Sequence, residues 1–131
     1  MIIKINSKEI ESLISCPGEK RYTYFVKRVV DREEVWGLYH DGWALASTDD
    51  GVTMFPFWPA PEYAGLCAEG SWEGFEPRSI PPGTFLNELL PKLRKDGLVP
   101  GIFYTPDDRG VTPDIDQLME DIRLELAKYE Y

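Results

Sequence analysis

The side chains with the most distinctive chemistry in this chain of 131 residues are two cysteines and a single histidine. Cys16 precedes Pro17 and Gly18 at an expected helix start, where the helix dipole could activate a thiol. His40 is the one imidazole that could serve it as a base, and the pair would have to meet across the fold. Because no local signature joins them, we interpret Cys16 as a buried or incidental thiol, Cys67 as a core residue and His40 as solvated.

The acidic residues are numerous, but their spacing predicts neither a metal site nor a catalytic pair. Zinc needs a cluster of Cys and His that this composition does not supply, and the pairs Asp49-Asp50 and Asp107-Asp108 lack the spacing of a calcium loop. No glycine pattern typical of nucleotide binding is present in the sequence. We predict no metal, no cofactor and no catalytic residue, and the alternative left open is a small hydrolase or transferase that uses carboxylates or Cys16.

The charge balance limits the partners. There are 23 acidic and 14 basic residues, and the net charge of -9 is unfavourable for nucleic acid or an anionic membrane and favours a basic protein partner. No apolar run approaches the ~20 residues that span a bilayer. The apolar run within 1–6 is too short for a signal peptide, and the low cysteine content fits a reducing cytoplasm.

The aromatic stretch 35–59 is expected to form the centre of a sheet. Asp41-Gly42 and Asp49-Asp50-Gly51 predict two chain reversals, so residues 36–39, 43–47 and 52–55 should form an antiparallel meander. We expect a two-residue type I′ turn at Asp41-Gly42. Pro56 has no amide to donate and should end the third strand or confine it to an edge.

Helical periodicity predicts the elements that pack on this sheet. A first helix is expected after the cap at Asn6, and a second from residue 19 to about 30 with Arg21 on its polar side. Further helices should begin after Pro59, after Pro81 and at Thr112, the last of them running to the C-terminus. Pro91 should disturb the helix that follows Pro81. Residues 98–104 should form the last strand. The prediction is one α+β domain, 1–131, with a mixed or antiparallel sheet of four to five strands closed by a C-terminal helix.

Aromatic side chains supply the candidate binding surface. Most should be buried, and the corner Phe57-Trp58-Pro59 is expected to be the exposed part, because an edge strand would end there. The full aromatic set is Trp36, Tyr39, Trp43, Phe55, Phe57, Trp58 and Trp72.

Several segments resemble a known family. The pattern Arg21-Tyr22-x-Tyr24-Phe25-x-Lys27-Arg28-Val29, then Trp36-Gly37-Leu38-Tyr39 with Asp41-Gly42-Trp43-Ala44, then Phe55-Pro56-x-Trp58-Pro59 with Glu62-Tyr63-Ala64, and Phe85-Leu86 with Leu89-Leu90-Pro91, is similar to a family of small bacterial proteins known as domain of unknown function 2750. The resemblance runs from about Tyr22 to the C-terminal helix. It implies the fold and a bacterial, cytoplasmic setting, and it brings no activity, cofactor or catalytic residue.

The functional expectation is a non-enzymatic protein-binding module. A second alternative is an immunity-type protein that neutralises a basic toxin, an analogy based on the segment Phe55–Pro59 followed by Glu62-Tyr63-Ala64.

Overall fold

The computed structural model describes residues 6–129, and residues 1–5 and 130–131 lie outside the description. The apolar run at the N-terminus therefore falls almost entirely outside the described residues. In chain order the elements are α1 (Ser7–Ile14), α2 (Gly18–Arg32), β1 (Val35–Tyr39), β2 (Ala46–Ser47), β3 (Thr53–Phe57), α3 (Pro61–Leu66), the 3-10 turn η1 (Gly70–Trp72), β4 (Glu76–Ile80), α4 (Pro82–Thr84), the π-helical turn η2 (Phe85–Leu89), α5 (Leu90–Asp96), β5 (Val99–Ile102) and α6 (Ile115–Ala127).

The predicted helices are confirmed, and local capping explains their ends. The side chain of Asn6 accepts a hydrogen bond from the amide of Glu9 at 2.8 Å and so caps α1. Asp114 caps α6 in the same way. The disturbance expected near Pro91 takes the form of the π-helical turn η2, which immediately precedes α5 with its proline in the first turn.

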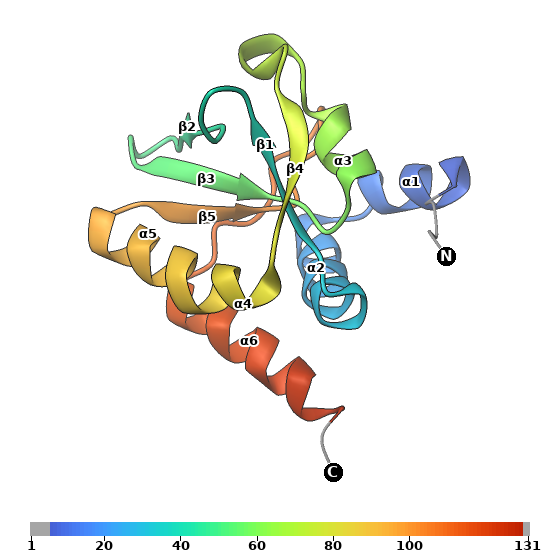
Figure 1. The fold of residues 1–131 in the computed structure, drawn as a ribbon. Helices are drawn as coiled ribbons and strands as arrows, with labels where there is room; N and C mark the ends of the chain where they lie inside the picture. The colour runs from blue at the N-terminus through green and yellow to red at the C-terminus, as the bar shows by residue number, and fades with distance from the viewer. Residues whose placement is uncertain (1–5, 130–131) are drawn as a thin grey trace.

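The five strands form an α+β fold, in two small sheets rather than one sheet of four to five strands. β1 pairs antiparallel with β4, and β3 pairs antiparallel with β2 and parallel with β5. Two main-chain hydrogen bonds between Trp36 and Trp58, at 2.9 and 2.8 Å, join β1 to the end of β3. β3 therefore lies at the centre, and β1 and β4 cross over it (Figure 1).

The expected meander is only partly present. The chain does reverse after β1, because Tyr39 and Trp43 form an antiparallel bridge. However, His40, Asp41 and Gly42 lie between them, so the predicted two-residue turn is wrong. β1 pairs with β4 and β2 pairs with β3, which leaves the bridge isolated. A Cβ on Gly37 would lie 2.9 Å from the Trp43 ring, and this close approach shows how tightly Trp43 packs across β1.

The second predicted reversal is confirmed. The amide of Thr48 donates to the carbonyl of Val52 at 2.8 Å, and that of Gly51 donates to Thr48 at 2.9 Å. Gly51 has a φ of 80°, a left-handed conformation that glycine adopts without strain. Asp49 and Asp50 thus lie in a tight turn beside β2.

Pro56 does not end β3, contrary to expectation. It lies inside the strand, in register with Gly101 of β5. On the opposite side of β3, the β2 pairing stops at Met54 and the bonds to β1 begin at Trp58. Pro56 falls in the gap between these two partners, where no strand needs its missing amide.

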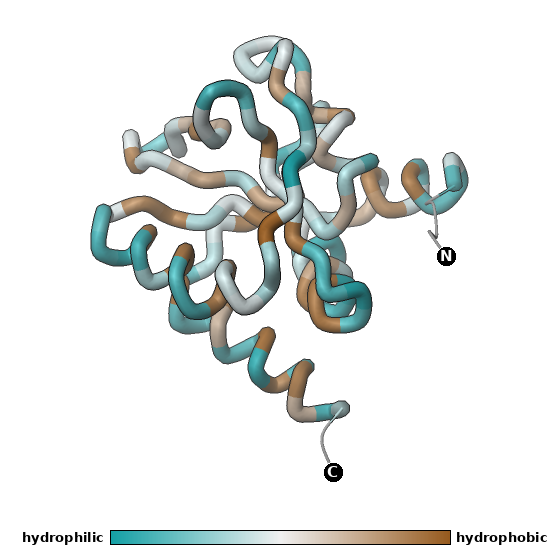
Figure 2. Tube along the Cα trace, viewed as in Figure 1, coloured by the Kyte–Doolittle hydropathy of each residue, from teal (hydrophilic) through white to brown (hydrophobic). Residues whose placement is uncertain are grey.

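The core lies between the strands, the helices α2, α3, α5 and α6 and the turn η2. Phe25, Phe57, Phe85 and Leu118 are fully buried in it. Figure 2 shows the strands as mainly apolar to neutral at the centre and the loop after β1 and the far end of α5 as hydrophilic. Among residues 6–129, no helix has both the length and the apolar composition needed to cross a membrane.

Candidate functional site

A groove of about 600 Å³ lies between β2 and the segment that follows β5. Its lining comprises residues 45–47, Cys67, residues 69–72 and residues 104–106. A second hollow of about 460 Å³ shares Ala46, Ser47, Trp72 and Tyr104 with it and extends to the turn 48–50 and Arg109. We call the two together the edge groove.

Aromatic and aliphatic side chains form the floor of the edge groove. Trp72 and Tyr104 are half-buried, and the side chain of Leu45 is 46% exposed. The Trp72 ring stands perpendicular to that of Trp58, with centroids 6.0 Å apart. Burial raises the pKa of the Tyr104 phenol, so this ring is neutral at physiological pH. The floor can thus contact an apolar side chain or the face of a cation.

One wall of the groove is the loop 103–110, and buried donors bind its main chain. The indole Nε1 of Trp58 donates to the carbonyl of Tyr104 at 2.8 Å, and the Cys67 thiol lies 3.3 Å from the same oxygen. Burial raises the pKa of Cys67 to about 12, which keeps it a neutral thiol. The prediction that Cys67 is a core residue is confirmed.

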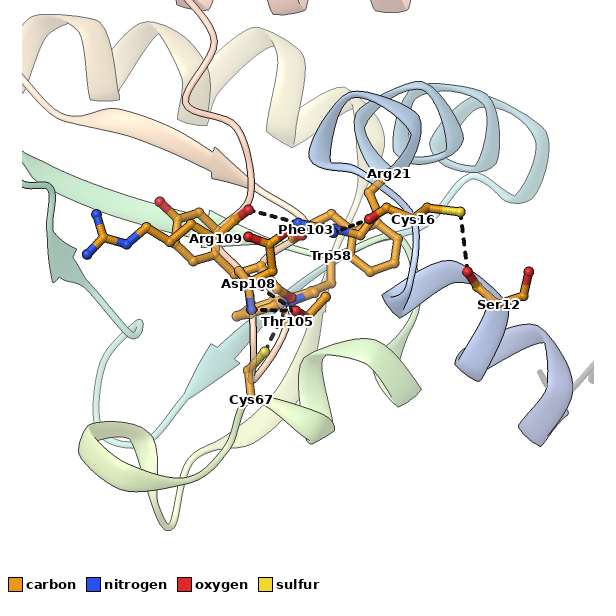
Figure 3. A network of polar contacts seen from close by, with 10 residues as sticks. Ser12, Cys16, Arg21, Trp58, Cys67, Phe103, Thr105, Asp108 and Arg109 are labelled. Carbon is orange, nitrogen blue, oxygen red and sulfur yellow. Dashed lines mark hydrogen bonds and ion pairs between the residues drawn. The ribbon is translucent and has the colours of Figure 1, made fainter.

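Arg21 reaches from α2 to the same loop and binds it (Figure 3). Its guanidinium is fully buried and donates to the carbonyls of Phe103 (3.0 Å), Cys16 (2.5 Å) and Arg109 (2.8 Å). An ion pair with Asp108 at 3.2 Å adds to these bonds. The placement of Arg21 on the polar side of its helix is therefore wrong, because main-chain carbonyls from the loop and from the end of α1 satisfy its charge inside the protein.

The two ends of the loop are also fixed. Phe103 has a φ of 57°, unusual for an aromatic residue, and its amide donates to the carbonyl of Phe57 at 2.9 Å. At the other end, two hydrogen bonds join Ile102 and Val111. A Cβ on Gly110 would lie 1.9 Å from the Ile102 carbonyl oxygen, so this close approach requires glycine.

The opposite wall, residues 45–50, is attached by contacts at the surface. The indole Nε1 of Trp72 donates to the Leu45 carbonyl at 3.2 Å. Arg109 forms an ion pair with Asp49 at 2.5 Å, and both side chains are more than two-thirds exposed. The ion pair joins the two walls across the groove without burying either charge.

Carboxylates surround the groove on several sides. They come from the β2–β3 turn, the segment before η1 and the loop 103–110, and they are Asp49, Asp50, Glu69, Asp107 and Asp108. Arg109 lies among them and is paired with Asp49. The net field at the groove is negative, which favours a cationic ligand.

The residues predicted to bind a partner lie in the core instead of on the surface. Phe57 and Trp58 are fully buried, and Pro59 is buried as well. The expected exposure of this corner is wrong, because β5 pairs along one side of the end of β3 and β1 bonds to the other. Trp58 contributes to the groove only from below, through its bond to Tyr104.

The structure does not bring Cys16 and His40 into one site. The Cys16 thiol is directed at the Ser12 carbonyl, 3.2 Å away, whereas His40 is exposed beside Phe75 and Asp41. Within residues 6–129, no three Cys, His, Asp or Glu side chains gather closely enough to hold a metal ion.

Sequence reasoning missed Arg21, Leu45 and Tyr104. For Arg21 a signal existed, because residues 21, 25 and 29 are four apart, so Arg21 shares one helix face with the apolar Phe25 and Val29. Leu45 and Tyr104 carry no comparable signal, since the groove exists only where distant segments meet.

A family model described as "Protein of unknown function (DUF2750)" matches residues 22–122. This match covers the strands, the helices α3 to α5 and most of α2 and α6, and it includes every segment that lines the edge groove. No curated protein and no solved structure matches the chain.

Proposed function

The chain belongs to the DUF2750 family, a family of unknown function, and we propose that it is a non-enzymatic module that binds a basic protein in the edge groove. The observation that carries this proposal is Leu45, nearly half exposed beside the half-buried rings of Trp72 and Tyr104. Aromatic residues with partly buried rings are typical of the centre of a protein interface.

Charge indicates the kind of partner. The whole chain carries a net charge of -9, and the carboxylates around the groove concentrate negative charge where the apolar contacts are. Opposite charge on a partner would speed the encounter, and the Leu45, Trp72 and Tyr104 contacts would then supply most of the affinity.

We also propose that the protein acts in the bacterial cytoplasm. Its two cysteines are free thiols, and the burial of Cys67 keeps it from pairing with another thiol without opening the fold. The similarity to a family expected in that setting supports the same location.

The test is capture of partners from a native lysate with Leu45→Glu compared with the wild type. Leu124→Glu is the matched control, because Leu124 is 57% exposed on α6, outside the residues that line the edge groove. We expect a basic protein to be retained by the wild type and by Leu124→Glu and lost by Leu45→Glu. Equal retention by all three proteins would show that the edge groove is not the binding site.

The captured partner then allows a kinetic test. Its association rate should fall steeply as salt rises from low to physiological strength, while dissociation changes less. An association rate that is indifferent to salt would remove the electrostatic part of the proposal.

A further inference from the structure

We propose that the partner binds as an extended segment added to the open edge of β2, pairing with the main chain of Ser47 and laying a Lys or Arg side chain over Trp72 and Tyr104. This inference rests on the proposed function and specifies how the edge groove is filled.

The hydrogen-bond pattern of the β2–β3 hairpin shows which groups of β2 are free. The amide of Thr48 donates to Val52 on β3. In an antiparallel pair the residues alternate between facing the partner strand and facing away, so Ser47, in register with Thr53, directs its amide and carbonyl away from β3. Ser47 is exposed and lines both hollows of the edge groove.

The β5 edge is closed, and the β4 edge is interrupted by a proline. On β5, alternation from Ile102, which bonds outward to Val111, places Pro100 outward as well. On β4, the residues paired with Trp36 and Leu38 of β1 face outward, because Trp36 bonds to Trp58 instead of to β4. These outward residues are Pro77, which has no amide to donate, and the exposed Ser79. Proline offers no donor to an incoming strand, and natural sheets use it in this way to prevent pairing. β2 carries Ser47 at its outward position, and Ser47, unlike Ser79, lines the edge groove.

Trp72 marks the point where an added segment would have to stop. Two residues before Ser47, the outward carbonyl of Leu45 already accepts the indole hydrogen of Trp72. The indole thus occupies the place of an amide from a neighbouring strand. The added segment would pair at Ser47 and leave the β2 edge at Trp72, with one of its side chains directed over the indole.

The chemistry of that side chain follows from the surroundings. The half-buried rings of Trp72 and Tyr104 offer faces to the aliphatic stem of Lys or to a guanidinium. Glu69 lies on one side and Asp50 on the other, so the charged end would meet a carboxylate. A basic residue within an extended segment fits both the edge and the floor.

The probe is an acetylated peptide of alternating lysine and valine, titrated into the protein while main-chain amide signals are followed by NMR. Ser47→Pro removes the outward amide at a position where a strand tolerates proline, and Ser47→Ala retains it. We expect the wild type and Ser47→Ala to bind alike, with a shift at the residue 47 amide, and Ser47→Pro to bind about tenfold more weakly. A peptide with methylated alternate amides should bind as weakly to the wild type. The amide spectrum of Ser47→Pro away from β2 verifies its fold.

Equal binding by Ser47→Pro and Ser47→Ala, or the absence of any shift at Ser47 in the wild type, would overturn the strand addition. The groove proposal is judged separately with Leu45→Glu. If Leu45→Glu loses the captured partner while Ser47→Pro retains it, the groove binds but not through the strand edge. If Leu45→Glu retains the partner, the proposed function itself is wrong.

Discussion

The two walls of the edge groove are held in different ways. The loop 103–110 is bound from beneath by the buried guanidinium of Arg21 and the buried indole of Trp58, which donate to its main-chain carbonyls. Residues 45–50 are attached by the Trp72 indole and by an exposed ion pair between Arg109 and Asp49. Hydrogen bonds in a buried, low-dielectric setting are costly to lose, whereas exposed ion pairs contribute little.

This contrast suggests a division of roles. The loop wall presents a fixed surface, with the Tyr104 ring in a set position. The β2 wall has an open edge and few buried contacts, which would allow it to adjust to the proposed partner strand. A partner would then meet one preorganised surface and one adaptable one, which limits the ordering cost of binding.

Arg21→Met should destabilise the loop wall, and it should have the largest effect on the stability of the protein. It leaves the carbonyls of Phe103, Cys16 and Arg109 without their charged donor, so we expect the free energy of unfolding to fall by about 3–5 kcal/mol. Urea unfolding followed by far-UV circular dichroism measures the change. Arg123→Met, at an exposed position on α6, serves as control and should leave the midpoint unchanged. A stability of Arg21→Met close to that of the control would show that the buried network does not hold the loop.

The two indoles give a direct comparison of the walls. Trp58→Phe removes the donor to the Tyr104 carbonyl at a fully buried site and should cost about 2 kcal/mol of unfolding free energy. Trp72→Phe removes the donor to the Leu45 carbonyl at the surface and should cost less than about 0.5 kcal/mol. The same denaturation experiment measures both. Equal losses would contradict the difference between the walls. Any loss of binding in a Trp58 variant then has to be separated from this loss of stability.

Alkaline pH should also lower the stability of the protein, through ionisation of the Cys67 thiol that contacts the loop wall. Because burial raises the pKa of this thiol from 9.0 to about 12, the unfolded chain releases the proton first as pH rises. The contribution of Cys67 is therefore intact below pH 9 and is lost progressively between about pH 9 and 12, at a slope of at most about 1.4 kcal/mol per pH unit. Stability measured at pH 8 and above should fall less steeply in Cys67→Ala than in the wild type. Identical pH slopes would show that this thiol ionises equally in the folded and unfolded chains.

The smallest effect on stability is expected when the ion pair that joins the walls is removed. Arg109→Ala removes the partner of Asp49, and because both side chains are exposed, urea unfolding should show no measurable change. Basic peptides should bind somewhat more tightly to this variant, because it removes a positive charge from an acidic groove. A clear loss of stability would show that the β2 wall depends on this pair more than its exposure indicates.

Helices were predictable from the sequence because their signals are local. Asn6, Pro91 and Asp114 act within one turn of their own position, as caps or as a disturbance of the backbone. Strand pairing depends on distant segments, so the pairing of β1 with β4 and of β3 with β5 could not be read from the hairpin signals at Asp41-Gly42 and Gly51.

The same dependence on distant segments explains why the sequence did not predict the candidate site. Trp58 looked like the end of an edge strand, and it is buried because β1, β5 and the loop after β5 all meet there. Arg21 was read as solvated because an isolated helix gives no sign of the carbonyls that will surround a buried guanidinium. The groove itself is the product of three segments that only the fold brings together.

The most direct test of the difference between the walls is native-state hydrogen exchange of individual amides in the free protein. The amides of Ile102 and Phe103, bonded to Val111 and Phe57, should exchange only when the whole protein unfolds. The amides of Thr48 and Gly51 should exchange at least about tenfold faster through local opening of the β2 wall, although both are hydrogen-bonded. Exchange of all four amides at the rate of global unfolding would contradict the account, because the β2 wall would then be as firmly held as the loop wall.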